Sequence, residues 1–267
     1  MFRSIFTKSL RDYRVAILAW GIGLGIILYA QYATYASQLA GASTAQLQQL
    51  VQQFSFFGET ARIDTPGGFA TFKAMGIVPL VLGIWTLLAG ARMTRGEEER
   101  GAMDILLSTP QARSRLLTQK VLALAVATGL LSVLIGLGIL GGMASANVTV
   151  DPVAALLGSL NAGLVAFFFG MLALLLAQFL SRGAAAGVSG GLMALFYVLD
   201  GTGRADPSAA GLRLFSPFYY YNQSLPLVPG YSMNWGAVAV LVALCVLCAG
   251  LAVPLFLRRD VGRSALA

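Results

Sequence analysis

Long apolar runs separated by short polar segments dominate this sequence. Six runs approach or exceed the ~20 residues that a helix needs to cross a bilayer; they are residues 15–35, 72–91, 116–140, 153–180, 184–199 and 235–257. The fifth run is short and rich in glycine. The pattern predicts an all-α membrane protein with six transmembrane helices, built as a single transmembrane domain over residues 1–267.

The first fourteen residues have an amphipathic pattern of their own. Their apolar members recur at the three-to-four spacing of one helical face: Phe2, Ile5, Phe6, Leu10 and Tyr13. Their basic members suit phospholipid headgroups: Arg3, Lys8, Arg11 and Arg14. We expect residues 1–14 to form an interfacial helix, after which the chain turns into the bilayer. The alternative is a basic tail that only sets topology.

Composition and charge agree with a membrane protein. The chain is 57% hydrophobic and only 11% charged, against about 25% charged in an ordinary soluble domain. Its net charge of +7 comes from basic residues before the first run, within 92–120 and after the last run, which places these segments and both termini in the cytoplasm. The charge is therefore a topology signal, and we expect lipid but no nucleic acid as a partner. The expected location is a bacterial plasma (inner) membrane.

Residues 92–120 form the most distinctive polar segment, in which a cluster of charges precedes a glycine: Glu97, Glu98, Glu99, Arg100 and Gly101. Asp104 then begins a short helical stretch that carries Ile105, Leu106 and Leu107. Such apolar residues outside the membrane need cover from lipid or from a protein groove, which an ordinary solvated loop would not give. A second helix begins near Pro110, because proline suits the first turn of a helix.

The string RGEEERGAMDILLSTP, which ends at Pro110, resembles the cytoplasmic loop of ABC-2 type permeases, the membrane subunits of a class of ATP-binding cassette transporters. The resemblance extends to the N-terminal helix, the six apolar runs and the LFSPFYY segment from Leu214. It implies that residues 101–110 are a coupling helix in a groove of a separate ABC-type ATPase subunit. Glu97 to Glu99 would link that helix to the interfacial helix through a polar network.

The resemblance also implies how the work is divided between subunits. The partner ATPase would bind ATP and Mg²⁺, and this chain contains no G-x-x-x-x-G-K-[ST] phosphate loop. A second copy of the chain, or a similar permease, would complete the membrane unit. Histidine is absent, so the commonest acid–base and metal-binding side chain is missing; we expect no catalytic site, metal or cofactor in this chain. Cys245 and Cys248 are expected to be structural.

The predicted outer side includes an amphipathic helix over 37–57 and an external loop over 201–234. Candidates for a substrate path are Lys73, Asn161, Tyr219 and Tyr220, although tyrosines at this depth also serve as interface anchors. Asp200, at the outer end of the fifth run, is expected to meet water. Pro79 is expected to kink the second helix, because proline removes a backbone hydrogen bond.

These features predict a permease subunit that exports a hydrophobic or amphiphilic compound such as a drug, an antibiotic or a lipid. A sparsely charged interior suits that cargo better than a proton relay. One alternative is a secondary transporter, which should show inverted repeats and broken midplane helices. Another is a membrane enzyme of lipid metabolism. The Asp200-Gly201 pair is weakly similar to the start of a motif in CDP-alcohol transferases, but the later paired aspartates are missing.

Overall fold

The computed structural model describes residues 4–34, 49, 56, 59–99, 101 and 112–258, without the side chains of residues 70, 73 and 74. Within these ranges the regular structure is helical and no strand occurs. The long helices are α1 (Ile5–Ala33), α5 (Val78–Arg92), α8 (Arg113–Ser145), α9 (Pro152–Leu176), α10 (Arg182–Ala205) and α12 (Trp235–Arg258). The short elements are α4 (Pro66–Ala70), the π-helical turn η1 (Thr71–Met75), α6 (Arg95–Glu98), the 3₁₀ helix η2 (Pro207–Phe215) and α11 (Pro217–Asn222).

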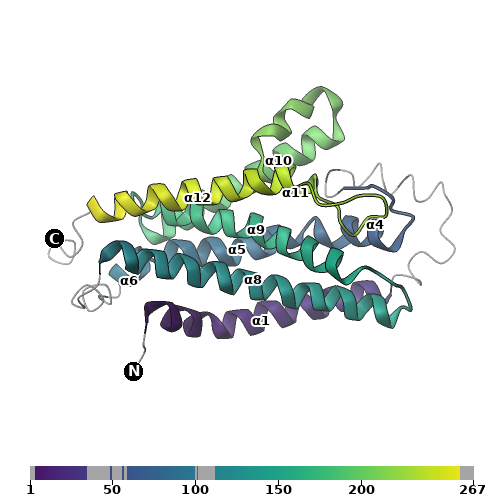
Figure 1. The fold of residues 1–267 in the computed structure, drawn as a ribbon. Helices are drawn as coiled ribbons and strands as arrows, with labels where there is room; N and C mark the ends of the chain where they lie inside the picture. Colours follow the sequence, from purple (N-terminus) through teal and green to yellow (C-terminus); the bar gives the residue numbers. More distant parts are fainter. Residues whose placement is uncertain are drawn as a thin grey trace.

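The long helices run side by side along one axis (Figure 1). The start of α1, the short helix α6 and the end of α12 lie at one end of the bundle, which we call the α6 end. The opposite end carries α4, and we call it the α4 end. The last part of α10 and η2 stand out from the side of the bundle.

Five helices are long and apolar enough to cross a bilayer, namely α1, α8, α9, α10 and α12. Many large apolar side chains on their outer faces are exposed, including Ile22 on α1 and Leu247 on α12, as expected where lipid replaces water as the solvent. The predicted all-α membrane fold is confirmed in class. The count of six spans is not, because α5 is apolar but has only 15 residues.

The N-terminal prediction fails at its boundary. Ile5–Ala33 is one continuous helix, so there is no separate interfacial helix and no turn near residue 14. The sequence between Ile5 and Trp20 contains neither glycine nor proline, so nothing in it breaks the helix. At about 1.5 Å per residue α1 exceeds the ~30 Å hydrocarbon core, so it has length to spare outside the membrane.

The second and fifth predicted spans also differ from the structure. The predicted kink at Pro79 is wrong, because Pro79 lies in the first turn of α5, where a helix loses nothing by lacking an N–H. The fifth span is longer than predicted, since Ser181 caps α10 by accepting a hydrogen bond from Ala184 N. The predicted external helix 37–57 lies almost wholly outside the described residues.

Glycine lets the helices approach closely in two pairs. In the α1–α8 pair, a methyl group at Gly138 would lie 2.3 Å from the carbonyl oxygen of Gly25. In the α5–α9 pair, a methyl group at Gly90 would lie 2.0 Å from the carbonyl oxygen of Gly170, and the Thr86 hydroxyl donates to Ala166 O nearby. Helices in lipid associate through such backbone contacts, because the lipid itself is as apolar as their side chains.

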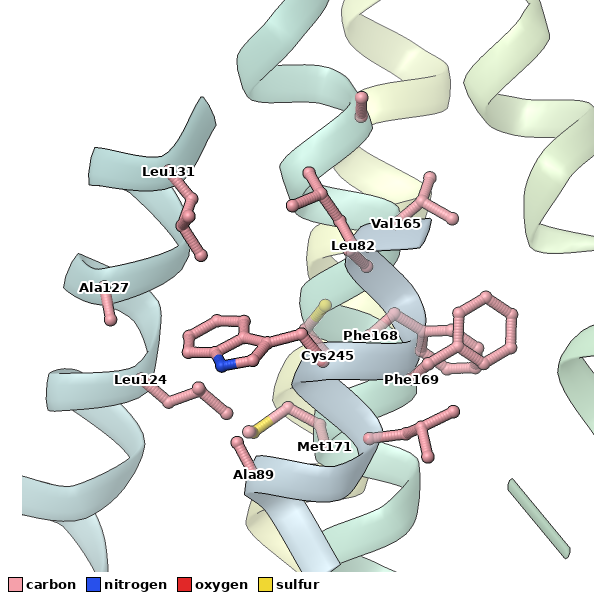
Figure 2. Close-up of a cluster of buried hydrophobic side chains, with 14 of the residues drawn as sticks. Leu82, Ala89, Leu124, Ala127, Leu131, Val165, Phe168, Phe169, Met171 and Cys245 are labelled. Carbon is pink, nitrogen blue, oxygen red and sulfur yellow. The ribbon is translucent and has the colours of Figure 1, made fainter. Parts of the chain in front are cut away.

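Apolar side chains fill the space between the pairs. Figure 2 shows Leu82 of α5, Leu131 of α8, Phe169 of α9 and Cys245 of α12 in one buried cluster. Helix α9 lies at its centre and contacts α5, α8 and α12. Both cysteines are free and buried in α12, which agrees with their predicted structural role.

The glycine contacts make a testable prediction about stability. We expect Gly90→Ala to lower the thermal midpoint in detergent by roughly 5 °C or more, because the new methyl group forces α5 away from α9. A maleimide dye can follow the unfolding, since the chain's 2 cysteines are buried until it unfolds. The matched control is Gly129→Ala, where a methyl group meets nothing within 4 Å; equal midpoints for the two variants would refute the close-packing account.

Candidate functional site

The polar segment after α5 folds into a single helical turn at the α6 end of the bundle. The α5 helix ends at Arg92, and α6 follows after a turn at Met93 and Thr94. Gly96 of α6 is buried, and a methyl group on it would lie 3.2 Å from Arg92 Cβ and 3.4 Å from Arg182 Cδ. The first turn of the segment is therefore held tightly against the end of the bundle.

Glu97 of this turn, whose side chain is 26% exposed, forms an ion pair with the buried ammonium of Lys120 of α8. Lys120 is only 3% exposed, and its ammonium also donates to Met93 O at 2.8 Å. A buried ammonium is tolerated only when it is paired and hydrogen-bonded. The pair thus ties the end of α5 to the first third of α8.

The other two glutamates of the triplet bind different cations. Glu98 accepts from Arg95 Nη1 at 3.3 Å, and Arg95 Nε in turn donates to Ala177 O and Leu180 O, both at 3.1 Å, just beyond α9. Glu99 Oε2 lies 3.4 Å from Arg182 Nε at the start of α10, in a partly exposed pair. The acidic triplet Glu97–Glu99 therefore connects α6 to α8, α10 and the end of α9.

The predicted link between the acidic triplet and the N-terminal residues runs, in the described part of the chain, along α8. Gln119 Oε1, next to Lys120, accepts a hydrogen bond from the backbone N–H of Phe6 at 3.2 Å. This N–H belongs to the first turn of α1, where helical donors have no partner within the helix. No ion pair joins Glu97, Glu98 or Glu99 to α1 among the described residues, so the full network stays a prediction.

The remaining predicted coupling residues lie beyond this turn. Gly101 adopts a φ of +67°, a left-handed conformation that favours glycine, as the expected break after the acidic residues requires. The other coupling residues lie outside the described residues: Arg100, Asp104, Ile105, Leu106, Leu107 and Pro110. The described chain resumes at Ala112, directly before α8.

The predicted substrate-path residues lie at the α4 end or within the bundle. Asn161 of α9 is 3% exposed and donates to Tyr221 O at 3.2 Å, which is a contact between helices. Tyr220 donates to Leu214 O at 3.2 Å, and the Arg213 guanidinium lies 5.1 Å from the ring centre of Tyr219. Lys73 belongs to the turn η1, and its side chain is outside the description. A substrate path through these residues stays a prediction.

Asp200 differs most from its prediction. Its side chain is completely buried inside α10 instead of meeting water. It pairs with Arg204 one turn later, and it accepts from Arg213 Nε at 2.9 Å and from Asn222 Nδ2 at 2.8 Å. Glu59 completes this outer cluster by pairing with both arginines. These bonds hold Gly201 within α10, where the start of the external loop 201–234 was expected.

The charges of the outer cluster reinforce one another. Burial alone would lower the pKa of the Arg213 guanidinium, but the hydrogen bonds and charges of Asp200 and Glu59 raise it above its ordinary value. Arg213 therefore stays charged over the whole physiological range and holds η2 against α10. The two acidic and two basic residues of the cluster balance in charge. Their contacts hold the short elements at the side of the bundle in place.

Two signals in the sequence point to partners that sequence reasoning missed. Lys120 falls within the third apolar run, 116–140, and a basic residue inside such a run is a sign of a buried pair. Asp200 and Arg204 have the i,i+4 spacing of a helical ion pair. Among the described residues, no group of three or more His, Cys, Asp and Glu side chains is placed to hold a metal ion.

The buried pair generates a second prediction. We expect Glu97→Gln to destabilise the protein by about 3 kcal/mol or more, because the Lys120 ammonium stays buried without a carboxylate. Adding Lys120→Met should recover most of the loss, since a well-packed apolar residue replaces the charge. The thermal midpoint in detergent measures both effects.

Arg182→Gln is the matched control for this prediction. It breaks the partly exposed pair with Glu99, which is worth about 1 kcal/mol or less. If Glu97→Gln costs no more than Arg182→Gln, the buried pair does not hold α6 in place.

The chain also matches a known protein family over nearly its whole length. The family is described as ABC-2 family transporter protein, and the match covers residues 3–261. This range includes every helix described above, from α1 to α12. No curated protein matches the chain significantly.

Proposed function

Because the chain belongs to the ABC-2 family of transporter proteins, we propose that it is the permease subunit of an ATP-binding cassette exporter for a hydrophobic or amphiphilic compound. Members of this family are the membrane components of transporters. Membership implies association with an ABC-type ATPase. In this proposal the ATPase is a separate subunit that binds ATP and Mg²⁺. A drug, an antibiotic and a lipid-like molecule all fit the sparsely charged bundle.

The observation that carries the proposal is the anchoring of the acidic triplet. Residues 101–110 follow α6 and precede α8, and both of these elements are fixed by the Glu97–Lys120 pair. A force on that segment is therefore transmitted directly to α5 and α8. Through Arg95 and Arg182 the same force reaches the end of α9 and the start of α10. This is the mechanical arrangement that a coupling helix needs.

Leu106 and Leu107 are the proposed contact with the ATPase. They follow the anchored turn by less than ten residues, so movement of the groove that holds them pulls on α6. ATP binding and hydrolysis in the partner would then switch the path for cargo. We propose that Arg100, Asp104, Ile105 and Pro110 also take part in coupling.

The proposed assembly lies in the plasma membrane of a bacterium, with both termini and the α6 end in the cytoplasm. Support comes from the concentration of basic residues before α1, in 92–120 and after α12. Further support comes from the start of α1 and the end of α12, which lie at the same end of the bundle (Figure 1). A second copy of the chain or a similar permease completes the unit. The cargo path at the α4 end would involve Lys73, Asn161, Tyr219 and Tyr220.

Docking of the ATPase can be tested with Leu106→Asp combined with Leu107→Asp. We expect this variant to insert normally and to lose the ATPase during purification in mild detergent, because two carboxylates cannot be buried in an apolar groove without a partner. The measurements are the amount of co-purified ATPase and the vanadate-sensitive rate of ATP hydrolysis.

The control carries Leu106→Met and Leu107→Met, which keep the site apolar and should retain the partner. Unchanged co-purification and unchanged transport-linked ATP hydrolysis in the aspartate variant would refute the docking site. A wild-type preparation that contains no ATPase, from cells shown to make one, would refute the exporter assignment itself.

A further inference from the structure

A cavity of about 470 Å³ lies near the α6 end, between α1, α5 and α8. Its volume falls within the roughly 300–1,000 Å³ range of small-molecule sites. The cavity exists because α1 packs mainly on α8 and α5 mainly on α9, which leaves a gap where the two pairs meet. None of its lining residues belongs to the outer cluster around Asp200.

One wall of the cavity is aromatic. Tyr13 and Trp20 line it from α1, and Trp85 lines it from α5. The rings of Tyr13 and Trp85 meet edge to face, with their centres 5.7 Å apart and their planes at 77°. Aromatic faces attract organic cations through their negative potential, and they also suit the boundary between lipid and water.

Among the described residues, two charged side chains that line the cavity, one of each sign, form no ion pair. Glu97 and Lys120 line the cavity but neutralise each other. Asp12 of α1 and Arg92 of α5 also line it, and within the described residues neither side chain forms an ion pair or a hydrogen bond. The site therefore offers one carboxylate, one guanidinium and a set of aromatic faces.

From this arrangement we infer that the cavity binds the zwitterionic headgroup of a membrane phospholipid. The ammonium of an ethanolamine headgroup lies between Asp12 and the aromatic wall, and the phosphate pairs with Arg92, whose planar guanidinium suits phosphate oxygens. The acyl chains leave over exposed apolar residues of the same helices, such as Leu18 and Leu88. An anionic headgroup would lack a group for Asp12, and a simple cation would leave Arg92 unpaired.

This inference goes beyond the proposed export function and does not depend on an ATPase. In the proposed orientation the cavity faces the cytoplasmic leaflet. Since Glu97 both lines the cavity and holds Lys120, a bound headgroup contacts the same turn that anchors the coupling segment. Lipid in the cavity would therefore influence the connection between the coupling segment and the bundle, without being the transported compound.

Tryptophan fluorescence offers a direct test. The chain has 3 tryptophans, of which Trp20 and Trp85 line the cavity, so Trp235→Phe leaves the two reporters alone. The purified full chain in detergent is titrated with dihexanoyl phosphatidylethanolamine and, separately, with dihexanoyl phosphatidylglycerol. We expect a saturable change with the first lipid and an apparent affinity at least about tenfold weaker for the second.

Two variants in that background localise the binding. Asp12→Asn and Arg92→Gln should each weaken binding of the ethanolamine lipid by about tenfold, as expected for the loss of one charge-assisted contact. Arg258→Gln, at an exposed position of α12 that does not line the cavity, should leave the affinity unchanged. Thermal midpoints confirm that each variant is folded.

Equal affinity for the two lipids, or unchanged affinity in both cavity variants, would overturn the inference. Saturable binding of choline chloride without a preference for the ethanolamine lipid would overturn it as well, and would indicate a site for soluble cations. Loss of ATPase docking in the Leu106 and Leu107 variant has no effect on this titration, so the failure of the export function and the failure of the lipid site are distinguishable.

Discussion

Close contact between glycine backbones is the constraint on which the rest of this bundle depends. Gly25 with Gly138 joins α1 to α8, and Gly90 with Gly170 joins α5 to α9. In lipid there is little hydrophobic gain from bringing helices together, so these contacts decide which helices pair. The pairing in turn creates the seam between α1 and α5 in which the cavity lies. The ion pair of Glu97 and Lys120 then connects the α5–α9 pair to the α1–α8 pair at the α6 end.

At two places in the molecule, buried charged residues attach a short element to a long helix. At the α6 end, Glu97 and Lys120 fasten the short helix α6 to α8. At the side of the bundle, Asp200 fastens η2 and α11 to α10 through Arg213 and Asn222. Each cluster brings a short element against a long one in surroundings of low polarity, where an incomplete pair is costly. The short elements thereby become parts of the rigid bundle.

The sequence predicts the long helices well and their ends poorly, for physical reasons. An apolar run records which residues meet lipid or the core, so α8, α9 and α12 follow their runs closely. Helix ends depend on single contacts, such as the Ser181 cap and the bonds of Asp200, which lie outside any hydropathy pattern. In the sequence, Lys120 has the position of a topology signal. Only the fold brings Glu97 beside it and shows that it belongs to an ion pair. The acidic triplet was predicted as a network, but two of its cations, Lys120 and Arg182, come from helices far from the triplet in sequence.

The shortness of α5 has a consequence for the surrounding bilayer. Its 15 residues rise about 22 Å, less than the ~30 Å hydrocarbon core, and Ile84 and Leu88 of this helix are exposed. The membrane beside α5 must therefore be thinner, or the residues that precede Val78 must fill the rest of its hydrocarbon core. The neighbouring helix α1, by contrast, is longer than the core. Where the bilayer thins, this hydrophobic mismatch costs elastic energy in the lipid, and a change in the tilt of α5 would alter that cost. A short helix between longer ones would in this way make the bundle sensitive to the thickness of its membrane.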